Sequence, residues 1–349
     1  MMILPLVNRL TTEIERLSSL IGASVQLLPE EVLDRSDSTG LNIPGKVSAN
    51  GSCRLVQAKD GWIAINLPRE CDREMIPALL EVHMDQVCWH DFGNMFRTRM
   101  KCDIVKSATL LGMAASFVGE TKTIYPFPFA HTTDSASSPH RRRSQLRVVD
   151  LSSLWAGPLC GAIFTSMGAD VLKVECARRS VSSMRGPSPH YLRLNGNKAL
   201  LQLDFESADH RRELRDLILK ADIVITSARP RALEQLGITP TDIMARNTGL
   251  IWIAITGHGW HGPQSLRIGF GDDAAVSGGL VQYYTDGSPM FLGDAIADPL
   301  TGLSAAMSGL EAVNRGTGAF IDASLASVAA GAAATLAEQN ISLVSASPE

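Results

Sequence analysis

Short apolar runs alternate with helical patterns from Arg147 onward, and this alternation limits the choice of fold more than any other feature. The runs are "RVVDL" (147–151), "DVLKVE" (170–175), "KALLQLDF" (198–205), "DIVIT" (222–226), "LIWIAI" (250–255) and "AFIDASL" (319–325). Continuous apolar runs separated by helices are typical of strands in a parallel sheet that is covered on both faces. The pattern predicts an α/β fold with a doubly wound, mostly parallel, Rossmann-like sheet.

The first 130 residues follow a different pattern. Helical segments surround two strand-like runs, "CRLVQA" and "GWIAINL", and Asp60-Gly61 between them is typical of a hairpin turn. The opening "MMILPLVNRLTTEIERL" predicts an amphipathic surface helix rather than a signal peptide. We therefore expect a small α+β domain at 1–130, a polar linker at 131–146 and a large domain at 147–349.

The composition argues against several classes of function. The net charge is −4 over 349 residues and the basic residues are spread along the chain, so we expect no nucleic-acid surface. The six cysteines form no C-x-x-C pair and have no histidine cluster beside them, which argues against a metal site and for reduced thiols in the cytoplasm. No apolar stretch of about 18 residues is free of charge, so we expect no membrane span.

The stretch "GHGWHG" (257–262) matches the G-x-G-x-x-G pattern of dinucleotide-binding proteins and follows a predicted strand. Such a motif should open a helix in the first βα turn of the fold. Here Pro263 follows at once, and the first βα turn, "SSLWAGP", lacks the glycines. We therefore predict a closely packed or mobile loop rather than a nicotinamide or flavin site.

A late stretch, "GDAIADPLTG" (293–302), places Asp294 and Asp298 ahead of an Ala-rich apolar helix. Taken alone, these carboxylates could cap the helix, bind a metal or act as covalent nucleophiles. Pro299 suits the first helical position. Two carboxylates without a further ligand type nearby are weak evidence for a metal, so the cap and the nucleophile remain the main alternatives.

Five blocks, in order, resemble the family III CoA-transferases, the group that contains formyl-CoA transferase, carnitine CoA-transferase and α-methylacyl-CoA racemase. They are "VVDLSSLWAGPLCGAIFTSMGADVLKVE" (148–175), "YLRLNGNKALLQLDF" (191–205), "ADIVITSARPRALEQLGI" (221–238), "AITGHGWHGP" (254–263) and "GGLVQYYTDGSPMFLGDAIADPLTGLSAAMSGLEAV" (278–313). Residues 48–120 resemble the small domain that follows in the family. The resemblance therefore implies a circular permutation, with the small domain first.

The resemblance implies a CoA-transferase in which Asp298 is the catalytic carboxylate and Asp294 has a supporting role. It implies an acyl-CoA and a carboxylic acid as substrates, no permanently bound cofactor and a homodimer. The residues that the resemblance places against CoA are Trp155, Ala156, Lys198, Ser227, Ala228, Arg229 and Ala232. The family's arginine after "KVE" is replaced by Cys176, so Arg178 or Arg179 is the candidate for the phosphates. The glycines expected in the loop that covers the carboxylate are Gly257, Gly259 and Gly262.

Two alternatives stay open on the same scaffold. One is a racemase that exchanges a proton beside the acyl carbonyl, and the other is a CoA-binding homologue without catalysis. The racemases of the family have a histidine where Gly269 and Phe270 stand here, and racemisation needs a second proton-transfer group. This difference favours CoA transfer.

Overall fold

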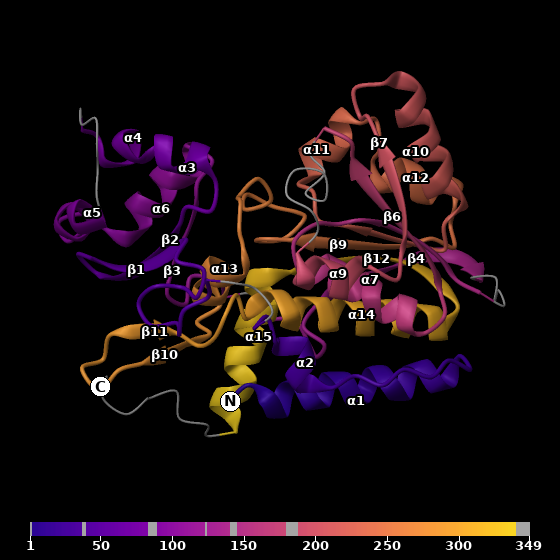
Figure 1. Ribbon diagram of the computed structural model, residues 1–349, viewed down its shortest axis with the longest axis horizontal. Coiled ribbons are helices and arrows are strands. Elements are labelled where there is room, and N and C mark those ends of the chain that lie inside the picture. Colours follow the sequence, from indigo (N-terminus) through magenta and orange to yellow (C-terminus); the bar gives the residue numbers. More distant parts are fainter. Residues whose placement is uncertain are drawn as a thin grey trace.

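The structure is a computed structural model that describes residues 2–36, 40–82, 89–122, 124–139, 145–178 and 188–339. A seven-stranded sheet in the order β4-β12-β9-β8-β5-β6-β7 forms its centre (Figure 1). Its strands are β4 (His131–Pro139), β5 (Arg147–Leu151), β6 (Asp170–Cys176), β7 (Ala199–Leu203), β8 (Ile223–Thr226), β9 (Ile251–Thr256) and β12 (Thr317–Ser324). Only β4 runs antiparallel to its neighbour, so the predicted mostly parallel α/β sheet is confirmed.

The strand order reverses between β5 and β8. From β5 the chain adds β6 and β7 on one side, and then returns to add β8, β9 and β12 on the other. In open α/β sheets, ligands bind beyond the carboxyl ends of the strands at such a reversal. The segments after Leu151 and Thr226 therefore mark the expected place of a binding site.

Helices cover both faces of the sheet because successive strand residues point to opposite sides. In β8 and β9, Ile223 and Ile251 belong to one core, while Val224 and Trp252 belong to the other. The first core is shared with α7 (Ala156–Ser166), α14 (Ala297–Arg315) and α15 (Leu325–Glu338). The second is shared with α10 (Ala208–Lys220), α11 (Pro230–Gln235) and α12 (Pro240–Arg246).

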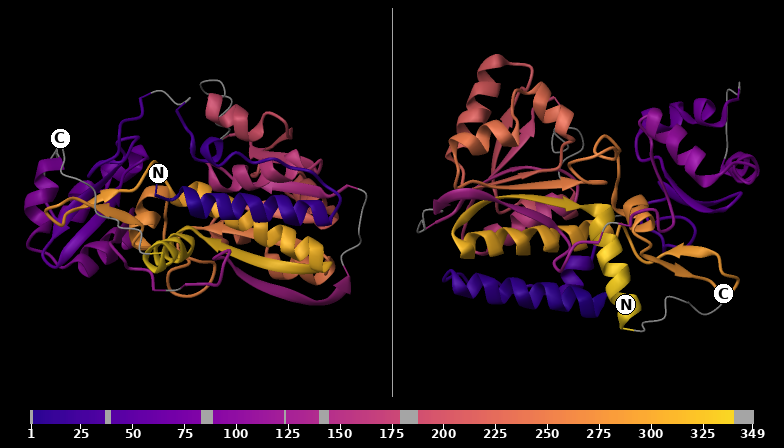
Figure 2. Two further views of the ribbon diagram at one scale, coloured as in Figure 1. Left: turned by 90° about the horizontal axis from the view of Figure 1, so that it is seen from below. Right: turned by 180° about the vertical axis from the view of Figure 1, so that it is seen from behind.

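Helix α14 lies between the sheet and the N-terminal helix α1 (Leu4–Leu20) (Figures 1 and 2). Most of its side chains are small or aliphatic and buried. At Gly302 a Cβ atom would lie 2.7 Å from the carbonyl oxygen of Ala156, so glycine allows α7 to approach closely. The start of α14 is thus held firmly against the start of α7.

A smaller three-stranded antiparallel sheet lies to one side of the large one (Figure 1). Its strands are β1 (Cys53–Ala58), β2 (Gly61–Asn66) and β3 (Ala114–Phe117), and its helices are α3 (Glu70–Glu74), α4 (Ile76–Leu80), α5 (Trp89–Phe96) and α6 (Lys101–Leu110). Ala58 pairs with Gly61, which confirms the hairpin predicted at Asp60-Gly61. The other face of this sheet packs on α13 (Gly271–Ser277) and on the hairpin of β10 (Val281–Tyr283) and β11 (Pro289–Phe291).

Two segments differ from the expected domain boundaries. The apolar stripe of α1, with Leu10 and Ile14 fully buried, belongs to the large core and not to a small domain at 1–130. Residues 131–139, expected to begin a linker, form β4 and pair with β12 at the edge of the large sheet. An edge strand pairs through its backbone and needs few apolar side chains, which explains why its polar composition was misleading. Residues 140–144 of the expected linker lie outside the described residues.

Candidate active site

Asp298 is the second residue of α14 and follows a turn from Gly293 to Ile296. The residue at the N-cap position is Ile296, and no side-chain hydrogen bond caps this helix. The helix-cap interpretation of Asp298 therefore has no support from the geometry. Asp298 is partly buried, and it lines two neighbouring cavities.

The carboxyl of Asp298 lies against the backbone of Gly271, the first residue of α13. A Cβ atom at Gly271 would be 2.4 Å from Oδ2 of Asp298 and 2.5 Å from the carbonyl oxygen of Ala295. No side chain fits such a gap without moving its neighbours. Glycine at this position therefore fixes where the carboxyl of Asp298 lies.

The surroundings of Asp298 oppose its ionisation. Burial raises the pKa of Asp298 to about 8, and the negative charge of Asp272 adds to the shift, while Arg35 acts against it. Burial likewise raises the pKa of Asp272 to about 7, with a contribution from Asp294. Oδ1 of Asp272 accepts a hydrogen bond from the backbone N–H of Ala295 at 3.0 Å, which favours the ionised form. Two carboxyl groups with raised pKa values in one cavity are typical of a functional site.

Arg35, from the segment after α2 (Pro29–Leu33), is a cation whose charge acts on Asp298 and Asp272. Its Nε donates to Oδ2 of Asp294 at 2.6 Å, and its Nη2 donates to Oδ1 of the same carboxylate. The Cζ atom of Arg35 lies 5.1 Å from the ring centroid of Trp155. The two-pronged ion pair and the aromatic ring together hold the guanidinium in place.

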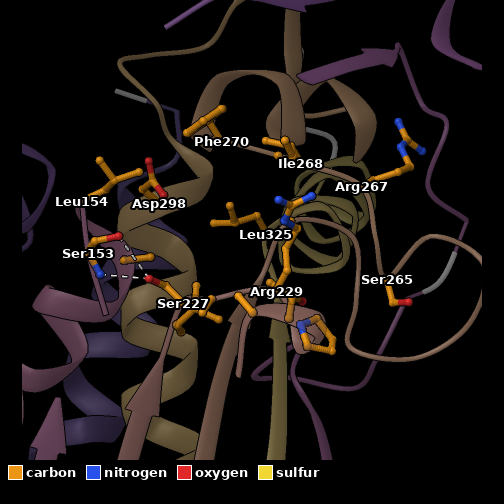
Figure 3. Close-up of a pocket in the computed structure, with 18 of the residues that line it drawn as sticks. Ser153, Leu154, Ser227, Arg229, Ser265, Arg267, Ile268, Phe270, Asp298 and Leu325 are labelled. Carbon is orange, nitrogen blue, oxygen red and sulfur yellow. Dashed lines mark hydrogen bonds between the residues drawn. The ribbon is translucent and has the colours of Figure 1, made fainter. Parts of the chain in front are cut away.

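The first cavity, of about 420 Å³, opens at the reversal of strand order. It lies between the segments that follow β5, β8 and β9, and Asp298 forms part of its wall. Its other lining residues include Ser153, Leu154, Ala156, Ser227, Ala228, Arg229, Ala232, Gly257, Arg267 and Phe270. The N–H of Ser153 donates to Oγ of Ser227 at 2.9 Å and ties the two strand ends together (Figure 3). Figure 3 places Arg229 and Asp298 around the same space, so a ligand phosphate and a reacting carbonyl could be held together there.

The second cavity, of about 300 Å³, lies on another side of Asp298. It lies between the N-terminal part of the chain, the start of α7, α9 (Pro189–Asn195) and α13. Its lining includes Arg35, Asn50, Ser52, Asn66, Leu154, Trp155, Lys173, Glu175, His190, Tyr191, Phe270, Asp272 and Asp298. Ser153, Leu154, Phe270 and Asp298 line both cavities, so the carboxyl of Asp298 lies where they meet.

Most residues predicted to contact CoA do line these cavities. Ala156, Ser227, Ala228, Arg229 and Ala232 line the first, and Trp155 lines the second. Of the three loop glycines only Gly257 lines a described cavity, whereas the N–H of Gly259 donates to Oγ1 of Thr256 and Gly262 lies further along the loop. No helix follows this loop before α13, in agreement with the rejection of a dinucleotide motif.

Three predicted cations differ from expectation or cannot be placed. Nζ of Lys198 is buried and donates to Asp150 and Pro158, each at 2.8 Å, and to Asn195 at 3.0 Å. Lys198 therefore joins the start of α7 to the end of β5, and it lines neither of the two cavities. Arg178 is exposed and pairs with Asp204 and Glu206, away from both cavities. Arg179 lies outside the described residues.

The sequence did not predict Asp272, Arg35 and Arg267 as part of the site. The "GDD" at 271–273 directly follows Gly269 and Phe270, and this was the available signal for Asp272. Arg267 is buried and pairs with Glu120 at 2.7 Å, which connects the wall of the first cavity to the small sheet. Arg35 lies 259 positions before its partner Asp294 in the sequence, and no local sequence pattern predicts a contact between residues so far apart.

Within the described ranges, no group of three or more histidine, cysteine, aspartate or glutamate side chains is placed to hold a metal ion. Among the helices of the same ranges, none has both the length and the apolar character required to span a membrane.

Comparison with known proteins agrees with this geometry. The family model for CoA-transferase family III matches residues 144–346, which is more than half of the chain, and the protein belongs to this family. An acyl-CoA transferase of Fusarium pseudograminearum is 32% identical over 212 residues, covering 55% of this chain and 46% of that protein. The succinyl-CoA–D-citramalate CoA-transferase of Chloroflexus aurantiacus is 30% identical over 202 residues, covering 54% and 50%.

The crystal structure of a CAIB/BAIF family protein from Brucella suis superposes with a TM-score of 0.51 at 30% identity, covering 56% of each chain. The chain spans about half the length of the curated relatives that it matches. The residues that the family model matches contain every strand of the large sheet except β4, both strand ends at the reversal, and α14 with Asp298.

Proposed function

We propose that the protein transfers CoA from an acyl-CoA to a carboxylic acid and that Asp298 carries the covalent intermediates. The observation that carries the proposal is the position of the Asp298 carboxyl at the junction of two cavities, one of them at the reversal of strand order. A thioester carbonyl in this place can be reached by the carboxylate while CoA and the acyl group extend in different directions. Membership of CoA-transferase family III supports the same chemistry.

The reaction requires an acid side chain and consumes no external proton. The Asp298 carboxylate attacks the thioester carbonyl, which gives an acyl–aspartyl anhydride and releases CoA thiolate. The thiolate attacks the aspartyl carbonyl, which gives an aspartyl-CoA thioester and the free donor acid. The acceptor carboxylate then attacks this thioester to give a second mixed anhydride and CoA thiolate. Attack of the thiolate on the acceptor's acyl carbonyl forms the new acyl-CoA and regenerates Asp298.

The residues around Asp298 suit this sequence of steps. The raised pKa of Asp298 means that ionisation is unfavourable in the empty site, and conversion to a neutral anhydride or thioester relieves the repulsion from Asp272. Phe270 and Leu154 line both cavities, and such apolar side chains suit intermediates that water would hydrolyse.

The test is a transfer assay with purified protein, one acyl-CoA donor and a panel of carboxylic acids, with the new thioester detected by chromatography. We expect new acyl-CoA with the wild type and at least a thousandfold less with Asp298→Asn. Absence of any transfer, with equal CoA binding by both proteins, would favour a CoA-binding homologue without catalysis.

A second candidate function is proton exchange beside the acyl carbonyl. The observation that favours it is Asp272, a second carboxyl group in the cavity that Asp298 also lines. Incubation of an acyl-CoA in deuterated water without an acceptor acid separates the two functions. Deuterium incorporation without transfer would support the second candidate and contradict the first.

We also propose that the small domain precedes the large one through a circular permutation and that the protein is a homodimer. The contribution of Arg35, Asn50 and Asn66 to the second cavity supports the view that the N-terminal part completes the site. Sedimentation equilibrium that gives a monomer over the full concentration range would contradict the dimer.

A further inference from the structure

Ala295, three residues before Asp298, has a backbone conformation that is unusual for its residue type. Its φ of 43° lies in the left-handed region, where the Cβ atom of an L-residue crowds its own backbone and only glycine is free of strain. Ala295 is also buried, with 6% of its surface exposed. Strained residues of this kind are found at functional sites, and they persist only where the surrounding structure holds them in place.

The backbone of Ala295 is held on both sides by hydrogen bonds. Its N–H donates to Oδ1 of Asp272 at 3.0 Å, and its carbonyl oxygen accepts from the N–H of Asp298 at 2.8 Å. Asp272 is itself only 3% exposed, so its carboxyl has little freedom to move. Asp294, the residue before Ala295, is held by its ion pair with Arg35. The turn that leads into Asp298 is therefore fixed from α13 and from Arg35.

The position of the Asp298 carboxyl depends on this turn. A Cβ atom at Gly271 would meet the carbonyl oxygen of Ala295 at 2.5 Å and Oδ2 of Asp298 at 2.4 Å, so both oxygens lie against the same glycine. The hydrogen bond from the N–H of Asp298 also joins the start of α14 to the carbonyl of Ala295. A rotation of the Ala295 backbone would therefore shift the carboxyl of Asp298 as well.

The hydrogen bond from Ala295 requires an acceptor oxygen on residue 272 and does not require a negative charge. A carboxylate, a neutral carboxyl and a side-chain amide each offer such an oxygen. A proton-transfer group, in contrast, must gain and lose a proton during the reaction, which an amide does not do. The two roles that Asp272 could have thus differ in whether asparagine can replace the aspartate.

We infer that Asp272 is a positioning residue: the hydrogen bond that it accepts from the N–H of Ala295 holds the left-handed turn, and this turn directs the carboxyl of Asp298 to the junction of the two cavities. The inference rests on the proposed function, because Asp272 acts here through Asp298. It assigns Asp272 a different role from the one that proton exchange would need.

The experiment compares Asp272→Asn, which keeps an acceptor oxygen, with Asp272→Ala, which removes it. Transfer is measured on the high-pH plateau of each protein's profile, so that a shifted pH dependence does not enter the comparison. We expect kcat of Asp272→Ala to fall about a hundredfold and KM for the acyl-CoA to stay within about threefold, because the nucleophile is displaced while the cavities remain. Asp272→Asn should have a kcat at least about tenfold above that of Asp272→Ala. Equal losses of kcat in the two variants would overturn the inference.

A second substitution tests the link to Ala295. Glycine adopts the left-handed conformation without strain, so a turn with Ala295→Gly depends less on the hydrogen bond. The double variant Asp272→Ala, Ala295→Gly should therefore have a kcat about tenfold above that of Asp272→Ala. The matched control adds Ala297→Gly to Asp272→Ala, because Ala297 is the first residue of α14 and glycine relieves no strain there. No gain with Ala295→Gly, or the same gain with Ala297→Gly, would overturn the inference.

Urea unfolding gives a measurement that needs no turnover. Ala297→Gly should lower the midpoint of unfolding because glycine is unfavourable in a helix, whereas Ala295→Gly should not lower it. The loss of stability caused by Asp272→Ala should be smaller in the Ala295→Gly background than in the wild type. This coupling, found together with a wild type that transfers no CoA, would contradict the proposed function and support the hold of Asp272 on the turn. Normal transfer without the coupling would overturn this inference alone.

Discussion

Replacing Asp298 by asparagine should stabilise the protein while it abolishes transfer. Burial and the charge of Asp272 raise the pKa of Asp298 from 3.8 to about 8. In the unfolded chain the carboxyl ionises near its ordinary pKa, so between about pH 4 and pH 8 the native state binds more protons than the unfolded state. The free energy of unfolding of the wild type therefore falls as the pH rises through this window.

The size of the effect follows from the shift. The difference of 8 − 3.8 is about 4 pKa units, or about 6 kcal/mol at 1.36 kcal/mol per unit once the group is fully ionised. Because part of the side chain faces water in the cavities, a smaller value of about 2–4 kcal/mol is expected for the measured change between pH 5 and pH 8.5. Asparagine does not ionise, so Asp298→Asn should lose this pH-dependent destabilisation.

Urea unfolding followed by tryptophan fluorescence at pH 5, 7 and 8.5 measures the effect. The stability advantage of Asp298→Asn over the wild type should be small at pH 5 and grow towards pH 8.5. The control is Asp209→Asn, an exposed residue paired with Arg212, which should change stability by less than about 0.5 kcal/mol at every pH. An advantage that is the same at all three pH values, or a less stable variant at pH 8.5, would refute the reasoning.

Three further predictions concern activity. Gly271→Ala should lower kcat about a hundredfold, because a Cβ atom there would lie 2.4 Å from Oδ2 of Asp298 and would displace this carboxyl. In the control Gly293→Ala, the Cβ atom would meet nothing nearer than 3.8 Å, and kcat should stay within about threefold of the wild type. Equal effects of the two variants in steady-state kinetics would contradict the geometry. Arg229→Ala should raise the KM for the CoA thioester about tenfold with little change in kcat, and an unchanged KM would exclude Arg229 from CoA binding. In the proposed mechanism the ionised form of Asp298 is the nucleophile, and its pKa is raised to about 8, so kcat/KM should rise between pH 6 and pH 8. This rise should move to lower pH in Asp272→Asn, and a profile that is flat or unmoved would count against the coupling of the two carboxyl groups.

The large sheet could be predicted from the sequence because its strands are buried on both faces. Predicted runs at 147–151 and 222–226 agree with β5 and β8 to within one residue, and these two strands frame the first cavity. Edge strand β4 was missed because its Thr and Ser side chains carry no apolar signal and its pairing uses the backbone. The packing of α1 on α14 was also missed, because amphipathicity shows that a face is buried but not against what.

The site residues could be predicted where one sequence segment contains both the functional side chain and the strand or helix that positions it. Asp298 and the lining residues Ser227 and Arg229 lie in recognisable blocks beside predicted strands or helices. The burial of Lys198 was not predicted because a lysine is ordinarily exposed, and the three acceptors around its Nζ become evident only in three dimensions. Arg35 could not be predicted at all, since its contact with Asp294 depends on how the N-terminal segment folds over the large sheet.

The central claim is that the carboxyl of Asp298 becomes acylated and then carries CoA. Incubation with an acyl-CoA, quenching with hydroxylamine and mass spectrometry of the digested protein test it most directly. The account predicts a hydroxamate on the peptide that spans residues 293–302, located at Asp298 and absent from Asp298→Asn. Transfer activity together with an unmodified Asp298, or a hydroxamate at another residue, would contradict it.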